Sequence, residues 1–142
     1  MPSHFDGLGV RVMYPDNWKI EDESESSVTL ESPGGAFLTI SKHDASVSID
    51  DAMQQASEAM SAEYDIVEQE DLSEEIAGAS VPIRVQRFVY LDLIIVARFY
   101  GITHDGDSYL LQVQGVDADV DELLPVFHAM ITSLCQSLVP SE

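Results

Sequence analysis

The sequence predicts an α+β fold, in which an antiparallel sheet of about six to seven strands is flanked by helices. Several segments alternate apolar and polar residues with the period of two that a half-buried strand requires, and an Asp-Gly pair typical of a hairpin turn joins two of them. Two other segments repeat apolar residues at helical spacing. The predicted order is therefore strands, a helix, a long strand meander and a closing helix.

The first third of the chain predicts a strand followed by a hairpin. Residues 8–14 alternate, and the Pro-Asp-Asn that follows ends the strand. Residues 28–31 and 36–40 alternate as well. The Ser-Pro-Gly-Gly between them favours a tight turn, because proline fixes φ and glycine accepts positive φ.

A helix is predicted from Ser48 to about residue 64. Ser48 can cap it, and Asp50 and Asp51 in the first turn complement the helix dipole. Its apolar stripe carries two methionines, which we interpret as core rather than as a flexible binding groove. Residues 65–76 then predict one exposed edge strand, whose acids would discourage edge-to-edge pairing.

The later strands give the strongest signals. Residues 81–85 alternate, and after a turn near Asp92 residues 93–102 are almost continuously apolar, as in a central strand covered on both faces. Asp105-Gly106 predicts a two-residue turn that pairs this strand antiparallel to residues 109–113.

The chain is predicted to close with a helix. Pro125 is expected in the first turn of this helix or at a kink, and Asp119 is expected to cap it with Glu122 as the capping-box partner. Its apolar stripe consists of Phe127, Met130, Ile131 and Leu134.

Length and composition indicate one domain spanning residues 1–142, with a core of about residues 7–136. The chain has 26 acidic and six basic residues and a formal net charge of −20. So few lysines and arginines argue against binding to nucleic acid or to anionic lipid, whereas a protein partner with a basic surface is electrostatically favoured. The same acidity would equally suit a protein adapted to a salty cytoplasm.

A cytoplasmic location is expected, because no signal peptide or membrane span is visible; a chain whose leader had been removed would look the same. The single cysteine, Cys135, cannot form an internal disulfide and is expected to be a small buried hydrophobe.

No motif reaches the specificity of a catalytic or metal site, so we expect no cofactor, no metal and no enzymatic activity. Residues 117–121 imitate the start of an EF-hand loop, but Glu122 and His128 stand where glycine and glutamate are required. The turn at residues 104–107 offers too few ligands for a cation. The alternative is a small enzyme or ligand-binding protein with a site assembled from scattered residues.

Several short motifs resemble the PsbP-like superfamily. They are Val12-Met-Tyr14-Pro15-Asp-Asn-Trp18, the segment 30–40 with its Ser-Pro-Gly-Gly turn, Ile76-Ala-Gly78, and the closing stretch from Pro125 to Leu134. This group includes the PsbP subunits of photosystem II, the Mog-type Ran-binding proteins and many small bacterial proteins of unknown role, among them chaperones of type VI secretion.

The resemblance implies an α-β-α sandwich and a binding or assembly role without chemistry. The chain departs from the photosynthetic members because it lacks a leader and a basic docking segment. Tyr14, Pro15 and Trp18 are interpreted as structural, since an indole at a strand end usually anchors core packing.

The functional prediction is therefore a non-enzymatic binding or assembly module, an accessory factor for protein interaction. We take the exposed acids as candidate docking residues for a basic partner. These are Glu21, Asp22, Glu23 and Glu25.

Overall fold

The computed structural model describes residues 2–44 and 46–138, and within them the chain forms nine strands and two helices. Their order is β1 (Pro2–Gly7), β2 (Val10–Pro15), β3 (Lys19–Glu21), β4 (Ser27–Glu31), β5 (Phe37–His43), α1 (Ile49–Glu63), β6 (Ile66–Ile76), β7 (Ala79–Tyr90), β8 (Leu93–His104), β9 (Asp107–Val116) and α2 (Asp117–Leu138).

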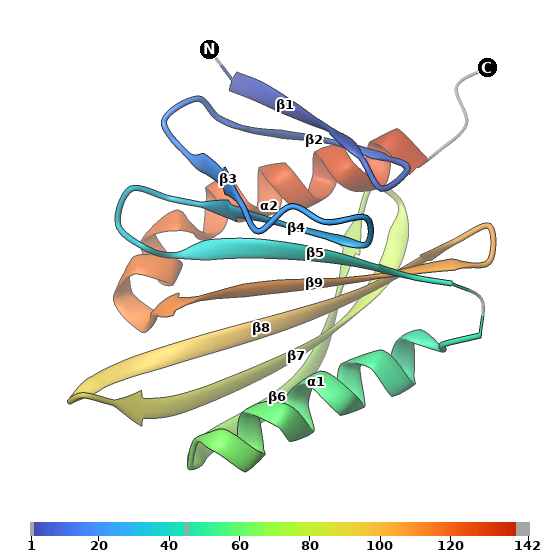
Figure 1. Ribbon diagram of the computed structural model, residues 1–142. Helices are drawn as coiled ribbons and strands as arrows, with labels where there is room; N and C mark the ends of the chain where they lie inside the picture. The colour runs from blue at the N-terminus through green and yellow to red at the C-terminus, as the bar shows by residue number, and fades with distance from the viewer. Residues whose placement is uncertain (1, 45, 139–142) are drawn as a thin grey trace.

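Seven strands form one antiparallel sheet in the order β3-β4-β5-β9-β8-β7-β6, and β1 and β2 form a separate hairpin. Helix α1 packs against β8 and β9, and α2 packs against β2, β8 and β9. The two helices lie on opposite faces of the sheet (Figure 1). This arrangement confirms the predicted α+β class and the sandwich of helices around an antiparallel sheet.

The predicted hairpins are present. Strands β4 and β5 pair through the Ser-Pro-Gly-Gly turn, in which Gly35 has a φ of +99°. Strands β8 and β9 pair antiparallel from His104 opposite Asp107 onward, around Asp105 and Gly106. Both turn residues have positive φ, 50° and 84°, which is the geometry that an Asp-Gly pair favours.

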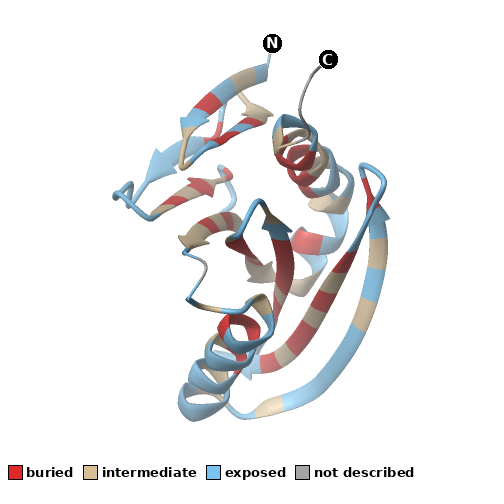
Figure 2. Ribbon diagram, turned by 90° about the vertical axis from the view of Figure 1, so that its right-hand side faces the viewer, coloured by how far each residue is buried: buried red, intermediate tan, exposed pale blue. Residues whose placement is uncertain are grey.

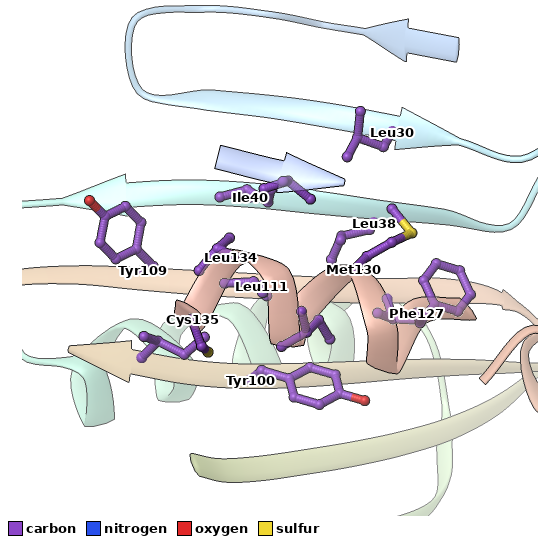
Figure 3. Packing of buried hydrophobic residues seen from close by; sticks show 14 of the residues in the cluster. Leu30, Leu38, Ile40, Tyr100, Tyr109, Leu111, Phe127, Met130, Leu134 and Cys135 are labelled. Carbon is purple, nitrogen blue, oxygen red and sulfur yellow. The ribbon is translucent and has the colours of Figure 1, made fainter. Parts of the chain in front are cut away.

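The larger part of the core lies between the sheet and α2. Phe127, Met130 and Leu134 of α2 are fully buried, and Figure 3 shows them directed onto apolar side chains of β5, β8 and β9. The predicted alternation of residues 109–113 places Tyr109, Leu111 and Val113 in this layer. The predicted helical stripe therefore does face the core.

A smaller cluster lies under α1. Ser48 caps the helix as predicted, its Oγ accepting a hydrogen bond from the Asp51 N–H at 3.1 Å. Met53 is buried against β8 and β9. The helix can approach closely because Gly101 has no side chain; a Cβ there would lie 2.6 Å from Cγ1 of Ile49. The methionine stripe is core, as interpreted.

Three expectations need correction. Strand β1 was not predicted, and the Leu8-Gly9 pair lies in the β1–β2 turn rather than in a strand. Helix α2 begins at Asp117, directly after β9, so Asp119 lies inside it and does not cap it. Pro125 stands well inside the helix, so it is not in the first turn, and the alternative of a kink at Pro125 stays a prediction. Because β9 runs straight into α2, no loop separates them for a capping residue to occupy.

The apolar run of residues 93–102 is only partly a covered central strand. Residues 96–102 are buried or nearly so, but Leu93 and Ile94 are exposed. They lie at the tip of the β7–β8 hairpin, which extends past both helices at the lower left of Figure 1.

Candidate protein-interaction surface

The residues of the family motif lie at the end of β2 and serve the core. Trp18 is 7% exposed and makes an edge-to-face contact with Phe127 of α2, with ring centroids 5.3 Å apart. This confirms that the indole is buried. Tyr14 and Pro15 are half-buried and line a mostly apolar groove of about 480 Å³ between β2 and α2.

The candidate docking acids lie at one edge of the sheet. Glu21 ends β3, and Asp22, Glu23 and Glu25 follow in the exposed connection to β4. The other acidic segment, residues 68–75, lies in β6 at the opposite edge. The two acidic segments therefore form two separate surfaces.

The most exposed apolar surface lies at the tip of the β7–β8 hairpin. Among the described residues seven large apolar side chains are exposed, and all but Ile20 of β3 belong to this tip or to the bulge of β6 beside it. We call these six residues the tip patch: Val67, Val89, Tyr90, Leu91, Leu93 and Ile94.

The hairpin arm is bare on both faces. Val89 is paired with Ile94, and Tyr90 with Leu93. Side chains alternate across a strand, so these two pairs point to opposite faces of the arm. Helix α1 ends near Phe88 and α2 begins near Arg87, and neither extends as far as the tip. Apolar side chains on both faces of the arm are therefore about half exposed, and neither helix packs over them.

The turn at the tip is conformationally costly. Within residues 2–44 and 46–138, four hairpins close through two-residue turns in which both residues have positive φ. Three of them have glycine in the second position, but the tip turn has Leu91 and Asp92, at φ of 51° and 64°. The left-handed conformation costs an ordinary residue about 1–2 kcal/mol, and Leu91 is 77% exposed, so it recovers little by burial.

An aromatic support lies beneath the tip. Tyr64, the C-cap of α1, stacks on Phe88 at 4.3 Å and meets Tyr90 edge-on at 5.8 Å. These three rings border a hollow of about 280 Å³ that Phe37 and Ile95 also line. Stacked rings hold the base of the arm in place, so the tip patch is presented on a supported arm beside a hollow.

Acids surround this apolar surface. Asp92 lies in the turn itself, Glu68 and Glu70 are on β6, and Asp119 lines the hollow. The neighbouring cation, Arg87, is already paired with Glu68 at 3.0 Å and Asp117 at 3.1 Å. The patch is therefore apolar at its centre and negative at its rim, the pattern of a protein interface with a polar rim.

A cleft of about 440 Å³ between β6, β8 and α2 is the place where scattered polar residues come together. Its wall contains Arg98, whose side chain is 12% exposed and whose Nε donates to the Tyr100 hydroxyl at 2.9 Å. Glu74 accepts from Arg98 Nη2 at 3.4 Å. Burial raises the pKa of Tyr100, so this phenol stays protonated and is no base near neutral pH. The arrangement is a satisfied ion pair in a small cleft.

The other candidate sites stay separate. His104 Nε2 lies 3.2 Å from Asp105 Oδ2, whereas Asp107 faces Lys42 at 3.6 Å. Within the described residues no three His, Cys, Asp or Glu side chains cluster as a metal site would require. Cys135 is buried as predicted, and burial raises its pKa to about 11. Such a thiol is a poor nucleophile.

Neither a protein-family model nor a curated protein matches the sequence. Solved structures do match the fold. Cyanobacterial PsbP (CyanoP) from Synechocystis sp. PCC 6803 is 12% identical with a TM-score of 0.63, over 93% of this chain and 90% of that one. The Saccharomyces cerevisiae Ran-binding protein Mog1p is 7% identical with a TM-score of 0.64, over 96% and 94%.

A protein of unknown function from Pseudomonas aeruginosa, PA94, is 18% identical with a TM-score of 0.50, over 99% of this chain and 98% of that one. At these identities the likeness concerns the fold alone. It confirms that the chain has the PsbP-like fold that its sequence motifs indicated.

In the described part of the chain, neither helix has the length and apolar character needed to cross a membrane. The tip patch was not predicted from the sequence. A signal for it was present, because Val-Tyr-Leu-Asp-Leu-Ile at residues 89–94 carries apolar residues straight through a turn that has no glycine or proline.

Proposed function

We propose that this protein is a non-enzymatic binding module that docks onto a protein partner through the tip patch. The observation that carries the proposal is the position of six exposed apolar side chains on and beside one hairpin arm, in a chain whose other exposed surface is strongly acidic. Contiguous apolar surface rimmed by polar residues marks interaction sites in soluble proteins.

The tip turn supports the same proposal. A leucine in the left-handed conformation, exposed to water, lowers the stability of the isolated protein. A partner that covers Leu91 would compensate this cost. The solved structures with this fold include a Ran-binding protein, which is consistent with a fold that serves protein recognition.

The charge distribution argues against other partners. The chain has six basic residues, and Arg84, Arg87 and Arg98 are already paired with carboxylates. Phosphate backbones and anionic lipids are therefore repelled rather than bound. The proposal includes no catalysis, which is supported by the cleft at Arg98, where an ion pair and a protonated phenol are present rather than an activated nucleophile.

Site-specific photo-crosslinking in the host cell tests the proposal. A photoreactive phenylalanine analogue replaces Leu93 at the tip, and in a matched control it replaces Lys19 on the exposed strand β3. We expect a discrete protein adduct from position 93 and none from position 19. Serine at Val89 and Ile94 should abolish the adduct while leaving the fold intact, because both side chains are exposed.

The proposal is wrong if position 93 gives no adduct, or if the serine variant gives the same adduct at the same yield. Adducts with lipid or nucleic acid rather than with protein would also contradict it.

A further inference from the structure

Strand β6 leaves one side of its backbone without a partner. It is the last strand of the sheet, and its 11 residues are bonded to β7 alone in the described part of the chain. Figure 2 shows it as the outer strand at the right, exposed along most of its length. We propose that this edge accepts an extended cationic segment of the protein partner as an eighth strand of the sheet. This inference rests on the function proposed above.

Negative charge is the main protection of this edge against strand addition. Exposed edges are normally short or carry proline, a bulge or charged side chains. Strand β6 is long, has no proline or lysine and has its bulge only at its start, between Ile66 and Glu68, so its acids act against neutral or acidic strands and leave the edge open to a cationic one. The opposite edge strand, β3, has only three residues. Unpaired N–H and C=O groups along a long strand are the recognition element for an added strand, and alternate side chains then provide specificity.

The acidic side chains of β6 favour an added strand that carries positive charge. Three of its acids are held by arginines of the sheet: Glu68 by Arg87, Asp71 by Arg84 and Glu74 by Arg98. Two more acids, Glu70 and Glu75, have no ion pair among the described residues. Their even and odd positions place one on each face of the strand.

These acids exclude a second copy of β6, because pairing two such strands would bring like charges together. Lysine or arginine at alternate positions of an added strand would instead meet a carboxylate. The negative charge of β6 therefore both disfavours pairing with a second copy of β6 and attracts a cationic strand.

The edge is continuous with the tip patch. Ile66 at the start of β6 is paired with Phe88, directly below the tip, and Val67 of the patch belongs to β6 itself. A segment that runs along β6 toward Ile66 would reach the apolar arm without a gap. The partner segment is thus extended and cationic along β6 and apolar where it reaches the tip.

The test uses a synthetic ten-residue peptide of alternating lysine and valine, titrated into isotopically labelled protein at low salt. We expect amide shifts concentrated in β6. A glutamate–valine peptide should not bind, and neither should a lysine–valine peptide with two central valines replaced by proline, because proline removes the strand donors but not the charge.

Charge variants make the test specific. Glu70→Lys with Glu75→Lys should weaken the binding of the peptide about tenfold. The lysines of the added strand share one face, so they lose the close attraction to one of these acids and gain a repulsion, while the second substitution acts at longer range. The matched control, Glu23→Lys with Glu25→Lys, makes the same change in net charge at the β3 edge and should alter the affinity by less than about twofold. The amide spectrum of each variant verifies that it is folded.

Three results would overturn the proposal: no binding of the lysine–valine peptide, equal binding of the proline peptide, or shifts centred on residues 21–25. Photo-crosslinking at position 93 distinguishes this failure from failure of the proposed function. If the adduct persists while the peptide fails, the partner docks at the tip without adding a strand.

Discussion

The two ends of the sheet are held together by different forces. At the end formed by β3, β4 and β5, with the separate β1–β2 hairpin beside it, apolar side chains pack against α2, and Trp18 closes the layer over Phe127. At the other end, β6 is hydrogen-bonded to β7, arginine–carboxylate pairs join it to β7 and β8, and the side chains of the tip patch are exposed. The first end supplies stability, and the second offers unpaired backbone and exposed apolar surface.

The largest difference between the two ends should appear on truncating an aromatic anchor. Trp18→Ala should lower the free energy of unfolding by about 3–5 kcal/mol, because the cavity opens into the main core. Ile94→Ala at the tip should change it by less than about 0.5 kcal/mol. Urea denaturation measures both. Equal losses from the two variants would mean that the tip is packed as tightly as the core.

The core beneath α2 should also be sensitive to alkaline pH. Burial raises the pKa of the Cys135 thiol from 9.0 to about 11. Below pH 9 the thiol is neutral in the folded and in the unfolded protein, so its full contribution to the free energy of unfolding is present. This contribution is lost as the pH rises from about 9 to about 11, because the thiol then ionises more readily in the unfolded protein. The loss amounts to at most about 2–3 kcal/mol.

The comparison with Cys135→Ala isolates the contribution of the thiol. Burial also raises the pKa of Tyr100 and Tyr109, but their ionisation lowers the stability of the wild type and of the variant alike. Between pH 9 and pH 11 the wild type should lose more stability than the variant. Parallel pH curves would mean that water reaches the thiol.

Much of the fold could be predicted from the sequence, because in most elements each local signal agrees with the tertiary structure. The α2 stripe, the Asp105-Gly106 turn and the cap at Ser48 all form as the pattern indicates. Strand β1 was missed because a leucine occupies its turn at positive φ, where the sequence pattern suggested a strand residue.

The tip was missed because apolar residues predict burial. No local pattern in the sequence reveals that both helices end before they reach Leu93.

The loosely held end should respond to the loss of one ion pair. Arg84 bonds Asp71 of β6 at 2.8 Å and also Gln54 and Ser57 of α1. Arg84→Gln should therefore lower the protection of β6 amides against hydrogen exchange by about 1–2 kcal/mol. The control is Arg11→Gln, whose pair with Asp6 is 60% and 69% exposed and should contribute almost nothing. Unchanged protection in Arg84→Gln would mean that apolar contacts hold β6.

The most direct test of the difference between the two ends replaces one leucine in each of two equivalent turns. Leu8 and Leu91 both occupy a two-residue turn at positive φ, 56° and 51°, but Leu8 packs against the core and Leu91 is exposed. Asparagine tolerates this conformation better than leucine. Leu91→Asn should therefore raise the free energy of unfolding by about 1 kcal/mol, whereas Leu8→Asn should lower it.

The same two variants are then measured for the photo-crosslinked adduct from position 93. We expect that Leu91→Asn, although more stable, reduces the yield of the adduct about fivefold or more, while Leu8→Asn keeps it. A Leu91→Asn protein that is less stable than the wild type and still forms the full adduct would show that the leucine serves the fold, and would contradict a binding role for the tip.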